Sequence, residues 1–379
     1  MSRWPKVRVR DIATFLKGKK PAVTYDSPVS GAQPYILIEN FNGAYRLFTD
    51  DNRCVACCPE DTLIVADGAN SGLVSSGHKG FLGSTIGALR PDTNRIHPRF
   101  LFFYTHSLFD VLNKHMRGAA VPHLEKDLLL DLEIVLPPLA DQEQIVRILD
   151  EADQLRRLRA EADYRTADLI PALFHDMFIR GTSSCPHAKL GEEAARVTKG
   201  ESPGWQGHEY CDSGPVFITS ENVLWGKIDI TNAKHIPEEF HVKLSRSQLQ
   251  PRDVLINLVG ASIGRCCLVP RGIGPANINQ AVACITPGNN LTPEYLCGFL
   301  LSQPIQRRLQ GGKVEAARAN ISLSDLRELD VPLPSMALQH QYIFYIEQIR
   351  SFEAEQAASR RRLDDLFQSL LHRAFQGEL

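Results

Sequence analysis

The chain contains an internal duplication. The segment LIPALFHDMFIRG, which ends at Gly181, aligns with LFQSLLHRAFQGEL, which ends at Leu379. The same 197 positions separate Phe178 from Phe375 and His175 from His372. At this offset Gln142 meets Gln339, and the proline at 137 meets the proline at 334. A repeat of this length is far longer than a solenoid unit and predicts two copies of one domain arrangement.

Three further matches lie upstream in the same order in both halves. They are PYILIENFNG from Pro34 with PVFITSENVLWGKI from Pro215, PEDTLIVADGANSG from Pro59 with PRDVLINLVGASIG from Pro251, and HPRFLFFYTHS from His97 with LTPEYLCGFLLSQ from Leu291. Chance can produce any one of these matches, but not four in order. A gene duplication explains them.

Each copy combines a globular part with a helical part. Residues 1–136 and 183–333 are rich in Gly and Pro and carry short apolar runs, such as Thr62–Val65 and Val254–Leu258, that predict strands. Helices are predicted over 98–112 and 293–309. The fold class is therefore α+β, with two globular domains, and each domain ends at a Pro-rich hinge because proline disfavours helix at the preceding residue.

The helical parts, residues 137–182 and 334–379, show heptad spacing. The first set of predicted seam positions is Ile145, Ala152, Arg159, Thr166 and Leu173 in one copy and Tyr342, Ile349, Gln356, Leu363 and Leu370 in the other. The second set is Ile148, Leu155, Ala162 and Leu169, with Tyr345, Phe352, Ser359 and Leu366. Equal length and equivalent polar breaks favour an antiparallel coiled coil. Two independent amphipathic helices are the alternative. Pro171 is expected to kink the first helix.

Composition restricts the class of protein. The 42 basic and 44 acidic residues give a net charge of −2, which weakly opposes an autonomous nucleic-acid binder. Nowhere do 18 apolar residues run together, and no secretory signal follows Met1, so no membrane association is expected. The 9 scattered cysteines are typical of reduced thiols in a cytoplasmic protein.

The sequence carries no recognisable catalytic motif. It has no Asp/Asn-Pro-Pro-aromatic motif of amino-methyltransferases, no Gly-x-Gly-x-x-Gly after a strand and no Gly-x-Ser-x-Gly. Cys54 and Cys57 form a C-x-x-C without the second pair that zinc requires. We therefore expect a protein that is not an enzyme and needs no cofactor or metal.

The chain resembles the specificity subunit of type I restriction-modification systems. The resemblance lies in two helical segments, LEIVLPPLADQEQIVRILDEADQLRR and the C-terminal SLLHRAFQGEL, which are combined with two non-identical globular regions. The resemblance covers nearly the whole chain. It implies two target-recognition domains (1–136 and 183–333) and two conserved helices (137–182 and 334–379). It also implies a non-catalytic subunit that reads a bipartite, asymmetric sequence in double-stranded DNA. That subunit would hold two adenine-N6 methyltransferase subunits on the DNA, and a translocating restriction endonuclease subunit could join them.

Candidate DNA contacts are polar and basic residues of predicted loops, because arginine reads guanine and amide side chains read adenine. They are Asn70, Ser71, Lys79, Arg117 and His123 in the first domain and Ser262, Arg265, Asn277, Asn279, Gln280, Lys313 and Arg318 in the second. Methyltransferase subunits are expected to dock at or beside Leu139, Ile145, Met336 and Ile343.

Two other classes of function stay open. One is a protein-binding coiled-coil scaffold whose globular domains recognise peptides. The other is a separate recognition subunit of a different restriction or phage-defence system. Neighbouring genes discriminate between them, because an adenine methyltransferase and a helicase-nuclease next door favour the type I reading.

Overall fold

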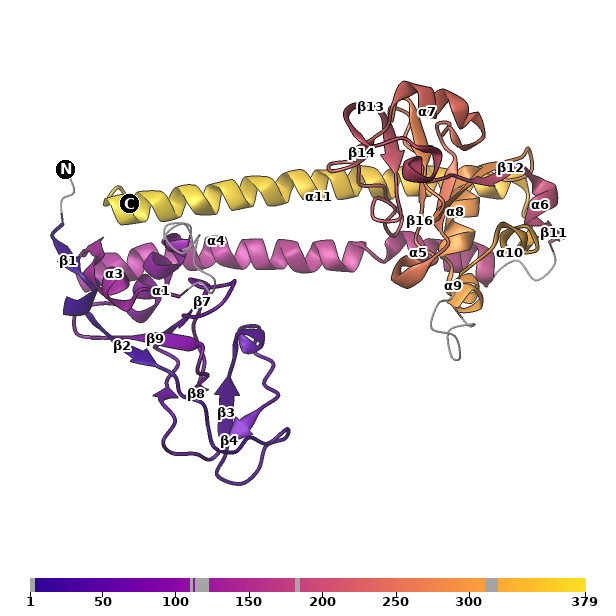
Figure 1. The fold of residues 1–379 in the computed structure, drawn as a ribbon. Coiled ribbons are helices and arrows are strands. Elements are labelled where there is room, and N and C mark those ends of the chain that lie inside the picture. The colour runs from indigo at the N-terminus through magenta and orange to yellow at the C-terminus, as the bar shows by residue number, and fades with distance from the viewer. Residues whose placement is uncertain (1–3, 110–111, 113–122, 181–184, 311–319) are drawn as a thin grey trace. The chain divides into compact units, whose positions relative to one another are not determined.

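The computed structural model describes residues 4–109, 112, 123–180, 185–310 and 320–379 (Figure 1). It divides into two compact units. The first unit contains residues 1–161 and 357–379, and the second contains residues 162–356. The first unit therefore combines the start of the chain with its end.

The strands of the two units correspond in order, except that α7 stands in the second unit where β5 stands in the first, and the elements of the two units are as follows. Those of the globular part of the first unit are β1 (Lys6–Arg8), β2 (Ala13–Lys17), β3 (Gln33–Ile36), β4 (Phe48–Thr49), β5 (Ala56–Cys57), β6 (Thr62–Val65), β7 (Val74–Ser75), β8 (Gly80–Leu82), β9 (Ile86–Pro91), α1 (Pro98–Ser107), α3 (Lys126–Asp131) and β10 (Glu133–Val135). Those of the second unit are β11 (His187–Lys189), α6 (Leu190–Glu193), β12 (Ala194–Lys199), β13 (Cys211–Ile218), β14 (Lys234–His235), α7 (Glu238–Lys243), β15 (Val254–Asn257), β16 (Cys266–Leu268), β17 (Ala276–Ile278), β18 (Val282–Pro287), α8 (Pro293–Leu301), α9 (Gln303–Gln310), α10 (Leu323–Arg327) and β19 (Asp330–Pro332).

The sheets confirm the duplication. In each unit the first strand pairs antiparallel with the last, as β1 with β10 and β11 with β19. Each unit also has a four-stranded antiparallel sheet, in the order β2-β9-β6-β7 or β12-β18-β15-β16. A second sheet in each, in the order β4-β3-β8-β5 or β14-β13-β17, contains one parallel pair, β3 with β8 or β13 with β17. The central strands β6 and β15 are buried along their whole length, as their continuous apolar runs predict.

Two long helices, α4 (Leu139–Thr166) and α11 (Met336–Gln376), each pass from one unit into the other. In the first unit Arg156 Nε of α4 lies 2.7 Å from Asp364 Oδ1 of α11, and its guanidinium covers the Phe367 ring at 4.4 Å. In the second unit Thr166 Oγ1 donates to Gln356 Oε1 at 3.0 Å. The helical segments are paired within each unit, so the alternative of two independent helices is wrong.

The pairing is antiparallel, as expected. In the second unit, Thr166 of α4 meets Gln356, whereas the later residue Phe174 packs against the earlier residue Tyr342. Phe174 belongs to α5 (Leu169–Phe174), which follows α4.

Four members of the first set of predicted seam positions are confirmed, because they are buried: Ile145, Ala152, Tyr342 and Gln356. The second set is wrong by one residue. Leu155 and Leu366 are 51% and 49% exposed, whereas their neighbours Arg156 and Phe367 face the partner helix. The residues of α4 that face inward are 142, 145, 149, 152 and 156. The seam position after residue 145 is therefore 149 and not the predicted 148, and the one after residue 152 is 156 and not the predicted 155. Both spacings keep one helix face inward, and packing on the globular part decides between them.

Two prolines divide helices that the periodicity alone joins. Helix α4 ends at Thr166 and α5 begins at Leu169, so the break lies just before Pro171. The predicted helix 293–309 is two helices, α8 and α9, which meet at Ser302 next to Pro304. A proline ring clashes with the carbonyl four residues earlier and removes a donor, which interrupts the helix there.

Candidate nucleic-acid interface

A buried glutamine fixes the start of each long helix. Gln142 is fully buried; its Nε2 donates to the carbonyls of Arg95 and Pro137, and its Oε1 accepts from His97 N at 2.8 Å. Gln339 repeats this pattern in the second unit. Its Nε2 donates to the carbonyls of Asn290 and Pro334, and its Oε1 accepts from Thr292 N at 2.8 Å. His97 and Thr292 are the N-cap residues of α1 and α8. Each glutamine therefore locks a long helix to the domain that precedes it.

In each unit a loop that follows the central strand meets a distant segment of the same unit. After β6, Asp67 forms an isolated bridge with His123, and Leu124 N donates to Ala66 O at 2.7 Å. After β15, Val259 bridges Asn320 in the same way, and Ile321 N donates to Leu258 O at 2.8 Å. We call these two places, residues 66–79 with His123 and residues 258–265 with Asn320, the first and second junction.

At the first junction the structure separates the predicted contacts. Asn70 and Lys79 are exposed. Ser71 is only 1% exposed, and its Oγ donates to Gly68 O at 2.6 Å. Its hydroxyl therefore closes a turn, and the buried Ser71 does not belong to the surface that could touch bases.

His123 is an exposed residue of the first junction, and the Asp67 carboxylate holds its side chain in place. Its Nδ1 lies 2.7 Å from Asp67 Oδ1, and Lys17 Nζ lies 2.6 Å from Asp67 Oδ2. Partial burial of the Asp67 carboxyl opposes ionisation, but the hydrogen bonds from Lys17 and His123 outweigh it and lower its pKa. The carboxylate thus keeps both basic side chains beside the loop.

At the second junction Ser262 and Arg265 are half-buried. Their loop contains Gly260 and Gly264, which adopt φ of +71° and +83°. Such angles favour glycine because a Cβ atom is strained there. The loop is closed by Arg265 N, which donates to Ser262 O at 3.1 Å, and by Gly264 N, which donates to Asn257 O at 3.0 Å.

The residues predicted from the text ANINQ do not act alike. Asn277 is fully buried, with Nδ2 donating to Leu244 O and Ser247 Oγ and Oδ1 bonded to His241 Nδ1. It stabilises the interior of the second unit, so its assignment as a DNA contact is contradicted by its burial. Asn279 is half-buried and accepts from Ala281 N at 3.0 Å, while Gln280 is half-buried. Asn277 lies within β17, whose residues are all buried, whereas Asn279 and Gln280 follow the end of that strand.

Three predicted contacts, Arg117, Lys313 and Arg318, lie outside the described residues. Two basic residues that the sequence analysis missed, Arg307 and Arg308, are exposed in the last turn of α9. Their signal is the segment QPIQRRLQ, a strongly amphipathic helix whose polar face is basic. Within the part of the chain that the structure describes, neither arginine forms an ion pair.

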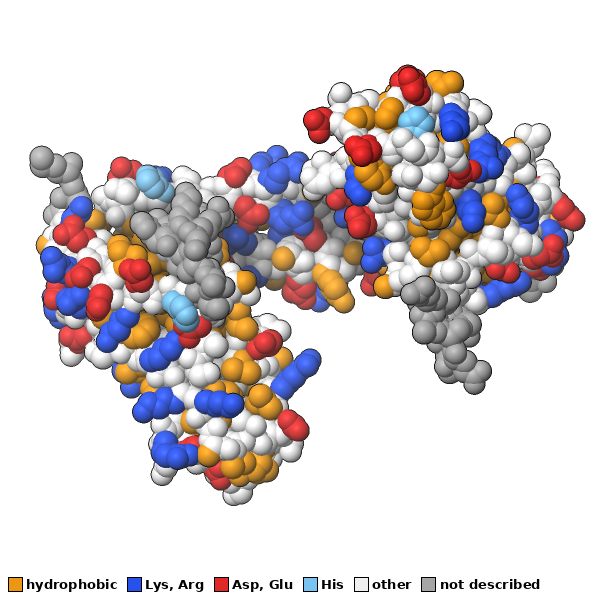
Figure 2. Space-filling view, viewed as in Figure 1, with side chains coloured by type: hydrophobic (Ala, Val, Ile, Leu, Met, Phe, Trp, Pro, Cys, Tyr) orange, Lys and Arg blue, Asp and Glu red, His pale blue; other side chains and the backbone are white. Residues whose placement is uncertain are grey.

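Charges of both signs are intermingled over each unit, as Figure 2 shows for one face. Within the described ranges, no group of three or more His, Cys, Asp or Glu residues is placed to hold a metal ion. No helix among the same residues is long and apolar enough to cross a membrane.

Comparison with known proteins identifies the family. The family described as "Type I restriction modification DNA specificity domain" matches residues 1–162 and again 209–358. The chain belongs to this family. Among curated relatives, the type I restriction enzyme MjaVIII specificity subunit of Methanocaldococcus jannaschii is 25% identical over 356 residues, which cover 89% of this chain and 83% of that protein. The EcoBI specificity subunit of Escherichia coli is 26% identical over 358 residues, covering 85% and 74%.

Solved structures of type I systems share the fold. A structure described as "Structural basis underlying complex assembly and conformational transition of the type I R-M system" matches 99% of this chain and 98% of that chain, with a TM-score of 0.65 and 20% identity. The S subunit from M. genitalium matches with a TM-score of 0.53 and 16% identity, over 99% of this chain and 96% of that chain. This specificity subunit is accordingly a DNA target-recognition protein of a type I restriction-modification system.

The partner contacts predicted for this type I specificity subunit divide as well. Leu139 and Met336 are 37% and 36% exposed, and Ile343 is half-buried. Ile145 is 3% exposed and belongs to the core of the first unit, so a partner cannot reach it. Residues assigned to the seam are exposed on the same helices instead, namely Leu155, Tyr345, Phe352 and Leu366.

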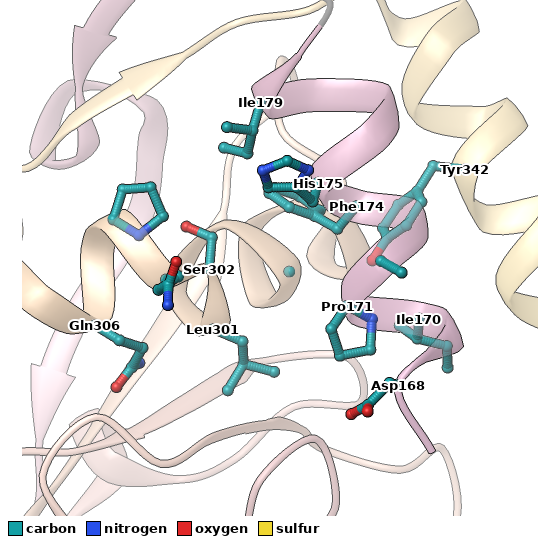
Figure 3. Close-up of a pocket in the computed structure, with 14 residues that line it drawn as sticks. Asp168, Ile170, Pro171, Phe174, His175, Ile179, Leu301, Ser302, Gln306 and Tyr342 are labelled. Atoms are coloured by element: carbon teal, nitrogen blue, oxygen red, sulfur yellow. The ribbon is translucent and has the colours of Figure 1, made fainter. Parts of the chain in front are cut away.

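The second unit also contains an apolar pocket of about 510 Å³ (Figure 3). Ile170, Pro171 and Phe174 of α5 line one side of it, while Leu301 and Gln306, at the junction of α8 and α9, line the other. Gln306 also contacts the loop of the second junction, since its Nε2 donates to Gly264 O at 2.9 Å. One side chain therefore connects the helical wall of the pocket to a candidate reading loop.

Proposed function

We propose that this specificity subunit reads an asymmetric, bipartite site in double-stranded DNA, one half-site with each junction. The duplicated junction carries the proposal. The same backbone arrangement presents Asn70, Lys79 and His123 in one unit and Ser262 and Arg265 in the other. Equal scaffolds with unequal side chains suit two half-sites of different sequence.

The proposed DNA-binding surface of the second unit also includes Asn279, Gln280, Arg307 and Arg308. We keep as proposed DNA contacts, from the sequence, Arg117, Lys313 and Arg318. Base edges are read by hydrogen-bonding side chains, whereas phosphate contacts mainly fix position. Partner subunits supply much of the phosphate contact, which reconciles the net charge of −2 with DNA binding.

The test is expression of the chain together with its methyltransferase partner in a host without adenine methylation. Mapping of methylated adenines is expected to show one two-part recognition sequence with a fixed spacer. Methylation without a two-part sequence, or with the same sequence when the specificity chain is left out, would contradict the proposal.

We further infer that two methyltransferase subunits dock on the helices, one near Leu139 and one near Met336 and Ile343, and that a restriction subunit can join. The proposed docking sites occupy equivalent positions of the repeat, and equivalent surfaces bind equivalent partners. The complex would act on DNA in the cytoplasm. Native mass measurement at saturating methyltransferase is expected to give two copies per chain, and a stable one-to-one complex would contradict this stoichiometry.

We infer that catalysis belongs to the partners. The chain lacks the sequence motifs of methyl transfer, and its own residues supply recognition and docking. The purified chain alone is expected to transfer no methyl group from S-adenosylmethionine to DNA, which a radiolabel transfer assay measures.

A further inference from the structure

We propose that Gln306 is a positioning residue that sets the specificity of the second unit by holding the loop that presents Arg265. This inference rests on the proposed reading of DNA by the second junction. It concerns a residue of α9 that the sequence analysis did not select and that need not touch DNA itself.

Gln306 ties two elements together through one amide group. Its Nε2 donates to Gly264 O at 2.9 Å and to Leu300 O at 2.7 Å, so the two donors of the amide serve the loop and the end of α8. Figure 3 shows Gln306 beside Leu301 and Ser302, where α8 passes into α9. The loop is thereby attached to a helical wall and not only to its own strands.

The contact is close at Gly264, the residue immediately before Arg265. A Cβ atom built on Gly264 would lie 2.4 Å from Gln306 Oε1, far inside a normal contact distance. With φ of +83°, this glycine also holds a backbone conformation that side chains disfavour. A side chain at position 264 would therefore displace the Gln306 amide from the loop that carries Arg265.

A second tie holds the opposite side of the same loop. Asn257 is fully buried, its N–H donates to Arg265 O at 2.9 Å and its Nδ2 donates to Ser220 O at 2.9 Å. The aligned residue of the first copy, Val65, makes the corresponding backbone hydrogen bond, from its N–H to Leu73 O at 2.8 Å, but it has no side-chain amide. The Gln306 side chain on one side of the loop and the backbone N–H of Asn257 on the other restrict the backbone of Arg265, as a bidentate contact to a base requires.

The substitution Gln306→Glu tests the proposal because it keeps the shape and replaces the donating amide by a carboxylate, which is repelled by both carbonyl oxygens. The full chain is expressed with its methyltransferase, and methylated adenines are mapped. The variant is expected to relax one base position in one half-site, lowering the preference for the correct base by roughly 5- to 150-fold, the range of one good arginine contact. The other half-site, read by the first unit, is expected to stay unchanged.

Two companions define the mechanism. Gln303→Glu makes the same chemical change at an exposed position three residues earlier in α9 and is expected to behave as wild type. Arg265→Ala is expected to relax the same position as Gln306→Glu. If Gln306 acts through Arg265, the double variant is no more relaxed than Arg265→Ala alone.

Two results would overturn the proposal. One is that Gln306→Glu leaves the base preference of both half-sites unchanged, or that its loss of base preference adds to the loss caused by Arg265→Ala. The other is loss of methylation at every site both in this variant and in Gln306→Asn, because it would assign Gln306 to folding. A failed proposed function looks different, since the wild-type complex would then show no two-part sequence at all.

Discussion

At the level of single residues, the hydrogen bonds of the buried glutamines Gln142 and Gln339 predict a measurable contribution to stability. Replacing Gln142 by Leu leaves one N–H and two carbonyls without their partner, and unsatisfied buried groups cost about 1–3 kcal/mol each. We expect the three groups together to lower the free energy of unfolding by about 3 kcal/mol or more, measured by urea titration. Gln144→Leu on the exposed face of α4 is the control. Equal stabilities would show that the three bonds contribute nothing.

His78 predicts a pH dependence of stability. Its Nδ1 lies 2.8 Å from Tyr45 Oη and its Nε2 2.6 Å from Ser75 Oγ, and burial lowers its pKa. The unfolded chain therefore binds this proton more readily, with a pKa of about 6.5. The stability that the neutral ring provides is complete above that pH and is lost as the pH falls through the lower, folded value.

We expect the free energy of unfolding to fall more between pH 7.5 and 5.5 in the wild type than in His78→Gln, which cannot be protonated. Denaturant titrations at both pH values measure the difference. An equal fall in the two proteins would place the acid sensitivity elsewhere in the first unit.

At the scale of elements, the corrected seam gives a paired test on neighbouring residues of α11. Phe367 is 1% exposed and carries the Arg156 guanidinium, while Leu366 is 49% exposed. Phe367→Ala is expected to destabilise the first unit by about 3–5 kcal/mol, and Leu366→Ala by less than about 1 kcal/mol. Thermal and urea unfolding of the two variants compare them. A larger loss for Leu366→Ala would restore the seam that simple heptad counting predicts.

At the scale of the whole molecule, α4 and α11 are the segments through which the chain passes between units, so their length is proposed to set the spacer between half-sites. Seven residues inserted before Arg159 and seven before Gln356 preserve the heptad register and lengthen each helix by ~10 Å. That length equals about 3 base pairs of DNA.

Methylome mapping of this variant is expected to show unchanged half-sites with a longer spacer. Single insertions, in α4 or in α11 alone, are the controls, because they mismatch the pair and should impair assembly. Changed half-sites with the original spacer would show that the helices do not determine the distance.

The duplication, the order of elements and the family resemblance were predictable from the residues alone, because they depend on local pattern and on identity between the two copies. The sequence singled out Gln142 and Gln339 as equivalent without giving their role. It also placed α4 and α11 in an antiparallel pair, and it found the first set of seam positions. These features follow from periodicity and turn chemistry, which act over a few residues.

Which of two adjacent residues faces inward, as at Leu366 and Phe367, depends on packing between distant segments, because both spacings are compatible with a helix. The tertiary structure alone removed Asn277 and Ile145 from the candidate surfaces, since burial depends on distant neighbours such as Leu244 and Ser247. It also decided that the end of the chain completes the first unit, where Phe375 packs on Phe100 at 5.2 Å between ring centroids. Such contacts join residues hundreds of positions apart, and no local pattern encodes them.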